Sequence, residues 1–415
     1  MSSAAGPSPA TPGASRIRLA LVLSLGAAVS LGITRFAYGL LLPPMRDDLG
    51  WSYALAGAMN TSNAAGYLLG ALLTPMLLRR AQPGSVMLAG ALAASVLMAV
   101  SGLFTDTGIW LLQRLAAGLT SALVFITGGL LAARLAAGDP ARAGLLIGLY
   151  YGGTGLGISL SALVVPLALQ QAAGQAHGWA YAWAALALLC FVGTGLLRWA
   201  VRQLAWADSG GSPGAVPSGA TAGTALAPMP LRRFAFALAG YGMFGVGYIG
   251  YMTFIVALLR AQGMAGGTIM AFYALLGVAV MASPRLWAGL LDRYRDGRPL
   301  ALLNALLGAA TLAPALSAAW PVVLASGILF GAVFLSVVAS TTAWVRHNLP
   351  PAQWAAGIGA FTIVFAGGQI IGPTVVGWIA DGPGGLERGF VVSALALWIG
   401  AVLALRQGAL HRAAP

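Results

Sequence analysis

Long apolar runs separated by short polar segments make up most of the chain. A helix that crosses a membrane needs about 20 mostly apolar residues. Most separators carry charges or turn residues, such as MRDDLGW at 45–51 and RDGRP at 295–299. The pattern predicts twelve membrane-spanning helices, over 17–42, 53–78, 85–104, 110–134, 143–169, 179–201, 233–259, 268–291, 299–316, 321–345, 355–380 and 389–406.

The segment between the sixth and seventh runs has a different composition. Residues 202–231 are rich in Gly, Ala, Ser and Pro, which predicts a flexible cytoplasmic linker. It separates two predicted six-helix bundles, 17–201 and 232–406. Residues 1–16 and 407–415 are expected to be cytoplasmic tails, the first one disordered. The first run starts like a signal peptide but continues without a convincing cleavage site, so we expect it to be retained.

The two halves of the chain repeat each other. RLAAGLTSALVF at 114–125 aligns with VLASGILFGAVF at 323–334, and LRRAQPG at 78–84 aligns with LDRYRDG at 291–297. In the first and seventh runs, Gly32, Arg35 and Tyr38 align with Gly245, Tyr248 and Tyr251. Internal repeats of membrane-spanning segments are typical of transporters, with the pathway between the repeats. The predicted fold is therefore an all-α polytopic membrane protein of two pseudo-symmetric six-helix bundles.

Composition supports a membrane protein. Hydrophobic residues make up 59% of the 415 residues and charged residues only 7%, too few to cover a soluble domain of this length. The 58 glycines suit close packing of helices in lipid.

The net charge of +13 is explained by membrane topology. With the N-terminus inside, sixteen arginines fall in cytoplasmic segments and only Arg46, Arg260 and Arg388 fall outside. This distribution follows the positive-inside rule. It predicts a multi-pass protein of a bacterial inner membrane with both termini cytoplasmic, and it leaves no reason to expect nucleic-acid binding.

Three arginines fall within predicted spans: Arg35, Arg114 and Arg285. Such a charge costs roughly 2.5–3.5 kcal/mol on insertion scales and by default marks a functional site. No acidic residue falls within a span, so an unpaired guanidinium needs an anion, water or backbone carbonyls. Arginine binds carboxylate or phosphate bidentately. For Arg35 and for Arg114 the alternative is a structural role, in which each pairs with other groups of the protein. For Arg285 the alternative is snorkelling to the interface.

Aromatic and polar residues complete the predicted binding site. Tyr38 lies one turn from Arg35, and Tyr248 and Tyr251 belong to an aromatic stripe of the seventh span that serves either packing or binding. Gln369 follows two glycines in the eleventh span. The polar run 60–63 is either an outer gate or a set of helix-to-helix hydrogen bonds. The predicted substrate-binding residues are Arg35, Tyr38, Arg114, Tyr248, Tyr251 and Gln369.

Two stretches resemble a known family. GITRFAYGLLLPPM at 32–45, followed by NTSNAAGYLLGALL at 60–73, resembles the YbfB/YjiJ family of the major facilitator superfamily. The loop at 289–298 resembles that superfamily's G-x-x-x-D-R-x-G-R loop, shortened by one residue. The resemblance implies that spans 1, 4, 7 and 10 line the pathway. It also implies a cytoplasmic latch formed by Gly289, Asp292, Arg293, Gly297 and Arg298, with arginines that pair across the bundle interface. In the first repeat Arg79 takes the place of Asp292.

The predicted function is secondary active transport of a small organic solute by alternating access. A carboxylate anion is the first candidate substrate, and export of amphipathic or drug-like compounds is the alternative. A proton or an exchanged solute would drive transport. The spans contain no acid or histidine for a proton, so proton symport would use Asp47 or Asp48 at the outer mouth or a protonated substrate, and exchange and facilitated diffusion stay open. We expect a monomer in the lipid bilayer with no cofactor, no metal and no enzymatic activity, because the sequence has no phosphate loop and no cluster of His or acidic residues.

Overall fold

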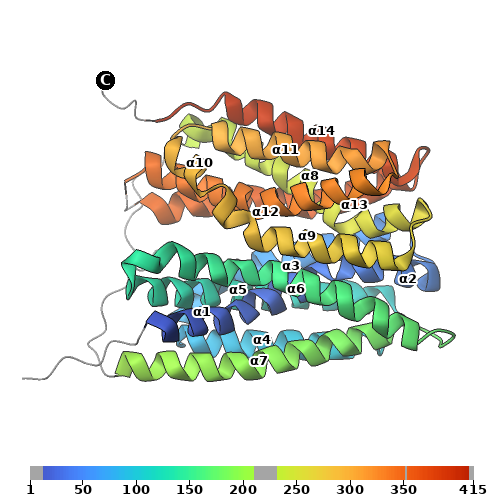
Figure 1. Ribbon diagram of the computed structural model, residues 1–415, viewed down its shortest axis with the longest axis horizontal. Coiled ribbons are helices and arrows are strands. Elements are labelled where there is room, and N and C mark those ends of the chain that lie inside the picture. Colours follow the sequence, from blue (N-terminus) through green and yellow to red (C-terminus); the bar gives the residue numbers. More distant parts are fainter. Residues whose placement is uncertain (1–12, 210–230, 351–352, 411–415) are drawn as a thin grey trace, which may run out of the picture.

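The computed structural model describes residues 13–209, 231–350 and 353–410, and these form a set of long, nearly antiparallel helices (Figure 1). The helices of the first half are α1 (Gly13–Ala27), the π-helix η1 (Ala28–Phe36), α2 (Tyr38–Leu49), α3 (Tyr53–Leu78), α4 (Pro83–Val100), α5 (Thr107–Ala137), the short 3₁₀-helix η2 (Pro140–Arg142), α6 (Ala143–Gln171) and α7 (Trp179–Ser209).

The second half begins with the short 3₁₀-helix η3 (Leu231–Phe234). It continues with α8 (Ala235–Ala261), α9 (Gly266–Leu286), α10 (Ala288–Arg293), α11 (Arg298–Leu316), α12 (Trp320–Asn348), α13 (Trp354–Ala380) and α14 (Gly385–Leu405). Figure 1 shows the helices of the first half below those of the second half. The predicted fold class, an all-α membrane protein of two six-helix bundles, is confirmed.

Within the described residues, eleven helical segments are long and apolar enough to cross a membrane. The predicted span that is not among these eleven is the second, 53–78, which corresponds to α3, a helix of 26 residues. Its polar run 60–63 lowers its mean hydropathy without interrupting the helix. The four predicted domain boundaries fall at described residues, whereas most of the N-terminal tail and of the linker, and the end of the C-terminal tail, lie outside the described residues. At their edges, α1 already begins at Gly13 and α7 extends to Ser209.

The first membrane span is longer than its hydropathy suggested. The predicted end at Leu42 is wrong, because α2 runs through Pro43 and Pro44 to Leu49 and ends at Gly50 with a left-handed φ of 66°. Membrane helices tolerate proline, because neighbouring groups can satisfy the carbonyls that it frees. The first span is therefore Ser15–Leu49, and Arg35 lies near its middle.

The eighth predicted span, 268–291, is divided. Helix α9 ends at Leu286, Trp287 interrupts the helix, and α10 continues to Arg293. Arg285 is exposed near the end of α9.

The two bundles meet closely at one end of the molecule, which we call the outer end after the predicted topology. It carries the loops 50–52, 262–265 and 381–384, and it lies on the right of Figure 1. A Cβ on Gly57 would come within 2.2 Å of the Pro373 carbonyl oxygen, and one on Gly377 within 2.2 Å of the Tyr53 carbonyl oxygen. Only glycine permits α3 and α13 to approach this closely.

A carboxylate reinforces the closed outer end. Asp381 follows α13, and its two oxygens accept hydrogen bonds from the backbone N–H groups of Tyr53 (2.7 Å) and Ala54 (2.9 Å). These groups belong to the first turn of α3, where backbone donors have no partner within the helix. Asp381 of one bundle therefore caps a helix of the other.

Candidate functional site

The site is built around the π-helix η1, which is continuous with α1. A π-helix is wider than an α-helix and is frequent at functional sites. Three of its carbonyl oxygens accept hydrogen bonds from side chains of other helices. Ser121 donates to Ser30 (2.9 Å), Arg114 to Thr34 (2.9 Å) and Tyr273 to Phe36 (2.8 Å). Neighbouring helices thus satisfy the irregular backbone, as a low-dielectric membrane interior requires.

Arg114 has a structural environment. It lies on α5 and is completely buried. Its guanidinium donates to the Thr34 carbonyl and to Asn60 Oδ1 (3.0 Å), and it lies 4.9 Å from the centre of the Tyr38 ring. All these partners belong to the N-terminal bundle. Two of its three guanidinium nitrogens are therefore engaged in joining α5, η1 and α3.

Arg35 has a different environment. It is 4% exposed, and in the described part of the chain its guanidinium makes one hydrogen bond, to Gln369 Oε1 of the opposite bundle. Its Nε, like that of Arg114, is buried without a hydrogen-bond partner. The guanidinium carbon lies 5.6 Å from the Tyr67 ring centre and 5.9 Å from that of Phe36. Among the described acids, none forms an ion pair with this cation.

The groups around Arg35 come together at mid-depth. Tyr67, Tyr248 and Gln369 lie near the middle of α3, α8 and α13. The phenol ring of Tyr67 lies beside the Arg35 guanidinium, and that of Tyr248 stacks on Phe365, which precedes Gln369 by one turn of α13. Within the described residues neither hydroxyl has a hydrogen-bond partner. One cation, one amide and two free hydroxyls thus face a common region between the bundles.

Aromatic rings cover the C-terminal side of this region. Tyr248 stacks on Phe244 (4.7 Å between ring centres), on Phe334 (5.2 Å) and on Phe365 (5.6 Å), with interplanar angles of 19–21°. The edge of this stack meets the N-terminal bundle where Phe334 packs against Phe36 (5.7 Å, at 83°). The aromatic stripe of α8 therefore belongs to a larger wall beside Arg35.

The hydroxyls of Tyr38 and Tyr251 have hydrogen-bond partners within their own bundles. The Tyr38 hydroxyl donates to the Ala56 carbonyl (3.0 Å), and its ring faces Arg114. Tyr251 hydrogen-bonds Ser326 (2.8 Å) and stacks on Phe330 (4.0 Å between ring centres) within the C-terminal bundle. The structure thus brings Arg35, Tyr248 and Gln369 together, and it gives Arg114, Tyr38 and Tyr251 partners within their own bundles.

The polar run of α3 joins helices on both sides. Asn60 donates to Thr253 of α8 (2.7 Å), and Thr61 donates to the Ile370 carbonyl of α13 (2.6 Å). Ser62 and Asn63 donate to the Leu111 and Arg114 carbonyls of α5. Every described hydrogen bond between α3 and the C-terminal bundle therefore lies between mid-depth and the outer end.

The loop at 289–298, the predicted cytoplasmic latch, makes its described contacts within the C-terminal bundle. Arg298 pairs with Asp296 (3.3 Å), and Arg293 and Arg298 lie 5.6 and 5.8 Å from the Tyr294 ring. The Gly297 N–H donates to the Gln407 carbonyl (2.9 Å), whereas Asp292 and Gly289 are exposed. Pairing of this loop across the bundles stays a prediction.

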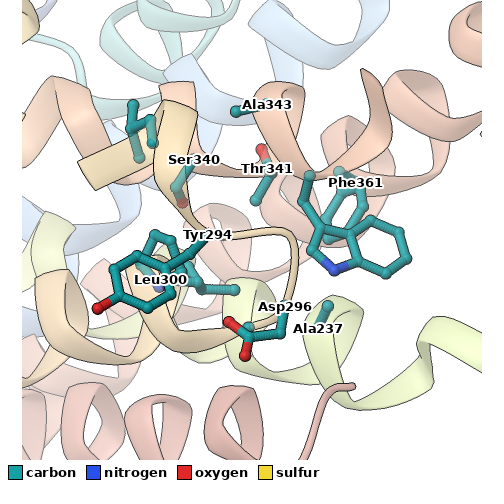
Figure 2. A pocket seen from close by; sticks show the side chains of 12 residues that line it. Ala237, Tyr294, Asp296, Leu300, Ser340, Thr341, Ala343 and Phe361 are labelled. Atoms are coloured by element: carbon teal, nitrogen blue, oxygen red, sulfur yellow. The ribbon is translucent and has the colours of Figure 1, made fainter. Parts of the chain in front are cut away.

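A pocket lies beside the same loop, and Arg35 is not among its lining residues (Figure 2). Its walls come from α8, α10, α11, α12, α13 and the 294–297 loop, and they include Tyr294, Asp296, Thr341 and Phe361. All its lining residues belong to one bundle. The pocket therefore does not lie on the interface that a transported solute would cross.

Three important residues of the site were absent from the sequence prediction: Tyr67, Phe334 and Phe365. Tyr67 could have been found, because it follows the polar run of α3 by one turn. Phe334 and Phe365 could not, because a phenylalanine in a membrane helix packs against lipid or protein with equal ease.

Comparison with known proteins agrees with this architecture. The family described as "Uncharacterised MFS-type transporter YbfB" matches residues 27–405. No curated protein matches the chain. Among solved structures, a bacterial homolog of the human lysosomal transporter Spinster, in its inward-facing and unoccupied conformation, is similar with a TM-score of 0.68 and 16% identity. The match covers 96% of this chain and 97% of that one.

The nucleoside transporter NupG is also similar, with a TM-score of 0.66 and 15% identity over 94% of this chain and 98% of that one. At these identities the likeness shows the fold alone.

Proposed function

Because the chain belongs to the MFS-type transporter family described as YbfB, we propose that it carries a small organic monoanion between its two bundles, with Arg35 as the residue that binds the anion. The observation that carries this proposal is that the Arg35 guanidinium is buried at mid-depth and has one hydrogen-bond partner, the Gln369 amide of the opposite bundle.

A carboxylate fits this guanidinium better than Gln369 alone does. Arginine presents paired N–H donors that match two carboxylate oxygens, and charge-assisted hydrogen bonds are roughly twice as strong as neutral ones. The Tyr67 and Tyr248 hydroxyls are free to donate to the same anion. A monoanion is favoured because the neighbouring cation, Arg114, already donates to two oxygens of its own bundle.

Alternating access follows from where the bundles touch. The described contacts hold the outer halves of α3 and α13 together, from Asp381 to Thr61. Under the predicted topology this is an inward-facing state. The Arg35–Gln369 hydrogen bond is the innermost of these links, so an anion at Arg35 would alter a contact that joins the bundles. We assign Arg114, Tyr38 and Tyr251 to positioning the helices that carry the site.

Coupling by exchange agrees best with this arrangement. Asp48 accepts from Trp179 (2.5 Å) and pairs with His177 (2.5 Å), both of the N-terminal bundle. It is therefore engaged at the outer end of its own bundle, away from Arg35. Exchange of one anion for another requires no protonatable residue at the site.

Uptake of a radiolabelled monocarboxylate into proteoliposomes tests the role of Arg35. Arg35→Lys keeps the charge but loses the paired donors, so we expect uptake to fall at least tenfold. Arg285→Lys, an exposed arginine at the end of α9, is the matched control and should transport normally. Wild-type uptake by Arg35→Lys would refute the proposal.

The aromatic wall supports the second candidate, export of amphipathic compounds. A stack of rings beside a transport pathway suits apolar solutes whether or not they carry a charge. Resistance to uncharged amphipathic compounds in expressing cells, unaffected by Arg35→Lys, would favour export over anion transport.

A further inference from the structure

The surroundings of Arg35 restrict the anion further, on the premise that the proposed function is correct. Beside the guanidinium, the described groups include the Gln369 amide, which accepts its hydrogen bond, and Tyr67, whose ring centre lies 5.6 Å from the guanidinium carbon. Burying a hydroxyl or a second charge without a partner is costly. Each further polar group of an anion, such as a hydroxyl of a sugar acid or the second carboxylate of a dicarboxylate, would need a partner of its own at the site.

Aromatic rings from both bundles also lie beside the site, and two of them are partly exposed. Phe244, Tyr248 and Phe334 are almost fully buried in their stack, whereas Phe365 and Tyr67 are partly exposed. Phe365 lies one helical turn before Gln369 on α13, so the two side chains share a face. Tyr67 lies against the Arg35 guanidinium from α3.

The register of α3 and α13 places these two rings at similar depth. The helices run antiparallel, with Gly57 against Pro373 and Thr61 hydrogen-bonded to Ile370. One turn further toward the inner end, the same register places the turn of α3 that carries Tyr67 beside the turn of α13 that carries Phe365. No hydrogen bond joins the two helices on that turn within the described residues.

We propose that the site binds an aromatic monocarboxylate. Its carboxylate lies on Arg35 and Gln369, and its ring lies against Phe365 and Tyr67 toward the inner end. Offset or edge contacts with two rings favour an aromatic ring over a saturated ring of equal size. The arrangement also unites the cation with the aromatic wall, because both would contact the same small molecule.

Calorimetric binding to the purified full chain in detergent, with three matched probes, tests this class. We expect benzoate to bind about 3- to 10-fold more tightly than cyclohexanecarboxylate, the range of measured ring–ring interactions. Benzamide, which keeps the ring without the charge, should bind at least tenfold more weakly than benzoate. Phe365→Leu should abolish the preference for benzoate, and Phe365→Trp should restore it.

Phe236→Leu, an exposed ring on α8, is the matched control and should leave the preference unchanged. Equal affinity for benzoate and cyclohexanecarboxylate, with both dependent on Arg35, would overturn the aromatic inference and leave the monoanion proposal standing. Equal affinity for benzoate and benzamide, or benzoate binding insensitive to Arg35→Lys, would instead overturn the monoanion proposal. Failure of benzoate to bind at millimolar concentration would overturn the aromatic inference.

Discussion

Arg35 and Arg114 are both buried arginines of the N-terminal bundle, and neither pairs with a described acid. They differ in what occupies their donors. Arg114 donates to a backbone carbonyl and to an amide oxygen of its own bundle, whereas Arg35 reaches one amide of the other bundle. Burial alone therefore does not distinguish a binding residue from a structural one. The two arginines differ instead in the number of their donors that are engaged and in the bundle that engages them.

The difference follows from the π-helix. Because η1 departs from α-helical geometry, its Thr34 carbonyl requires a donor from another helix, and Arg114 supplies it. Arg35 lies one residue further along the chain, on the side that faces the second bundle. One arginine completes the backbone of its own bundle, and the other reaches Gln369 of the second bundle.

The largest effect is expected on folding, from Arg114→Ala. The Thr34 carbonyl and Asn60 Oδ1 would each lose a donor, at about 1–3 kcal/mol per buried group, and the truncation would leave a cavity. We expect destabilisation of about 3–5 kcal/mol, measured as a lower thermal unfolding midpoint in detergent. Arg285→Ala, at an exposed position, should leave the midpoint nearly unchanged. An Arg114→Ala protein as stable as wild type would remove the distinction between the two arginines.

Gln369→Glu places a permanent carboxylate beside Arg35. An opposite charge in contact with a buried cation stabilises its charged form. We expect a higher unfolding midpoint without ligand and at least a tenfold loss of monocarboxylate affinity, because the internal carboxylate occupies the anion's place. Gln369→Leu separates charge from size and should not raise the midpoint. If Gln369→Glu bound carboxylates as wild type does, Arg35 would not be the anion site.

Asp381→Ala tests the link between the bundles at the outer end. Losing a capping side chain costs about 0.5–2 kcal/mol, and here it acts on a contact between bundles. The open form of the outer end should therefore become about 3- to 30-fold more populated. Spin labels on cysteines placed at Asp47 and Pro383 would report this as a longer distance. Glu387→Ala, an acid in the exposed first turn of α14, should not change that distance.

The smallest effect is expected from Tyr248→Phe. It removes one hydroxyl near Arg35 and keeps the stacked ring, so stability should change by less than about 1 kcal/mol. Monocarboxylate affinity should fall about 2- to 10-fold in a binding titration. Tyr251→Phe, whose hydroxyl is bonded to Ser326, is the contrasting variant and should not change affinity. Equal effects of the two substitutions would show that the Tyr248 hydroxyl does not contact the anion.

Hydropathy predicted the helices well and their interruptions poorly. Every predicted span has a helical counterpart, but Pro43 and Pro44 do not end the first span, and Trp287 does divide the eighth. Hydropathy reports how residues partition into lipid. Whether a helix continues through a proline depends on which neighbours satisfy the freed carbonyls, and these neighbours are distant in the sequence.

The candidate site was predicted in part for a similar reason. Arg35 and Gln369 were both identified as isolated polar groups in apolar runs, and the structure joins them directly. Tyr67 and Phe365 were not identified, because their significance depends on the register between α3 and α13. Arg114 was grouped with Arg35, because a sequence shows which charges lie in the membrane but not which carbonyls they meet.

The amino-acid sequence alone thus determines that this chain is a duplicated bundle of membrane helices with unpaired cations in its first half, because hydrophobic runs and internal repeats are local properties. The tertiary structure decides which partners each cation has. That outcome depends on a π-helix whose Thr34 carbonyl accepts a hydrogen bond from Arg114, and on helices from opposite bundles that meet at Arg35. Hydrogen bonds between groups hundreds of residues apart are set by packing geometry, which no single stretch of the sequence contains.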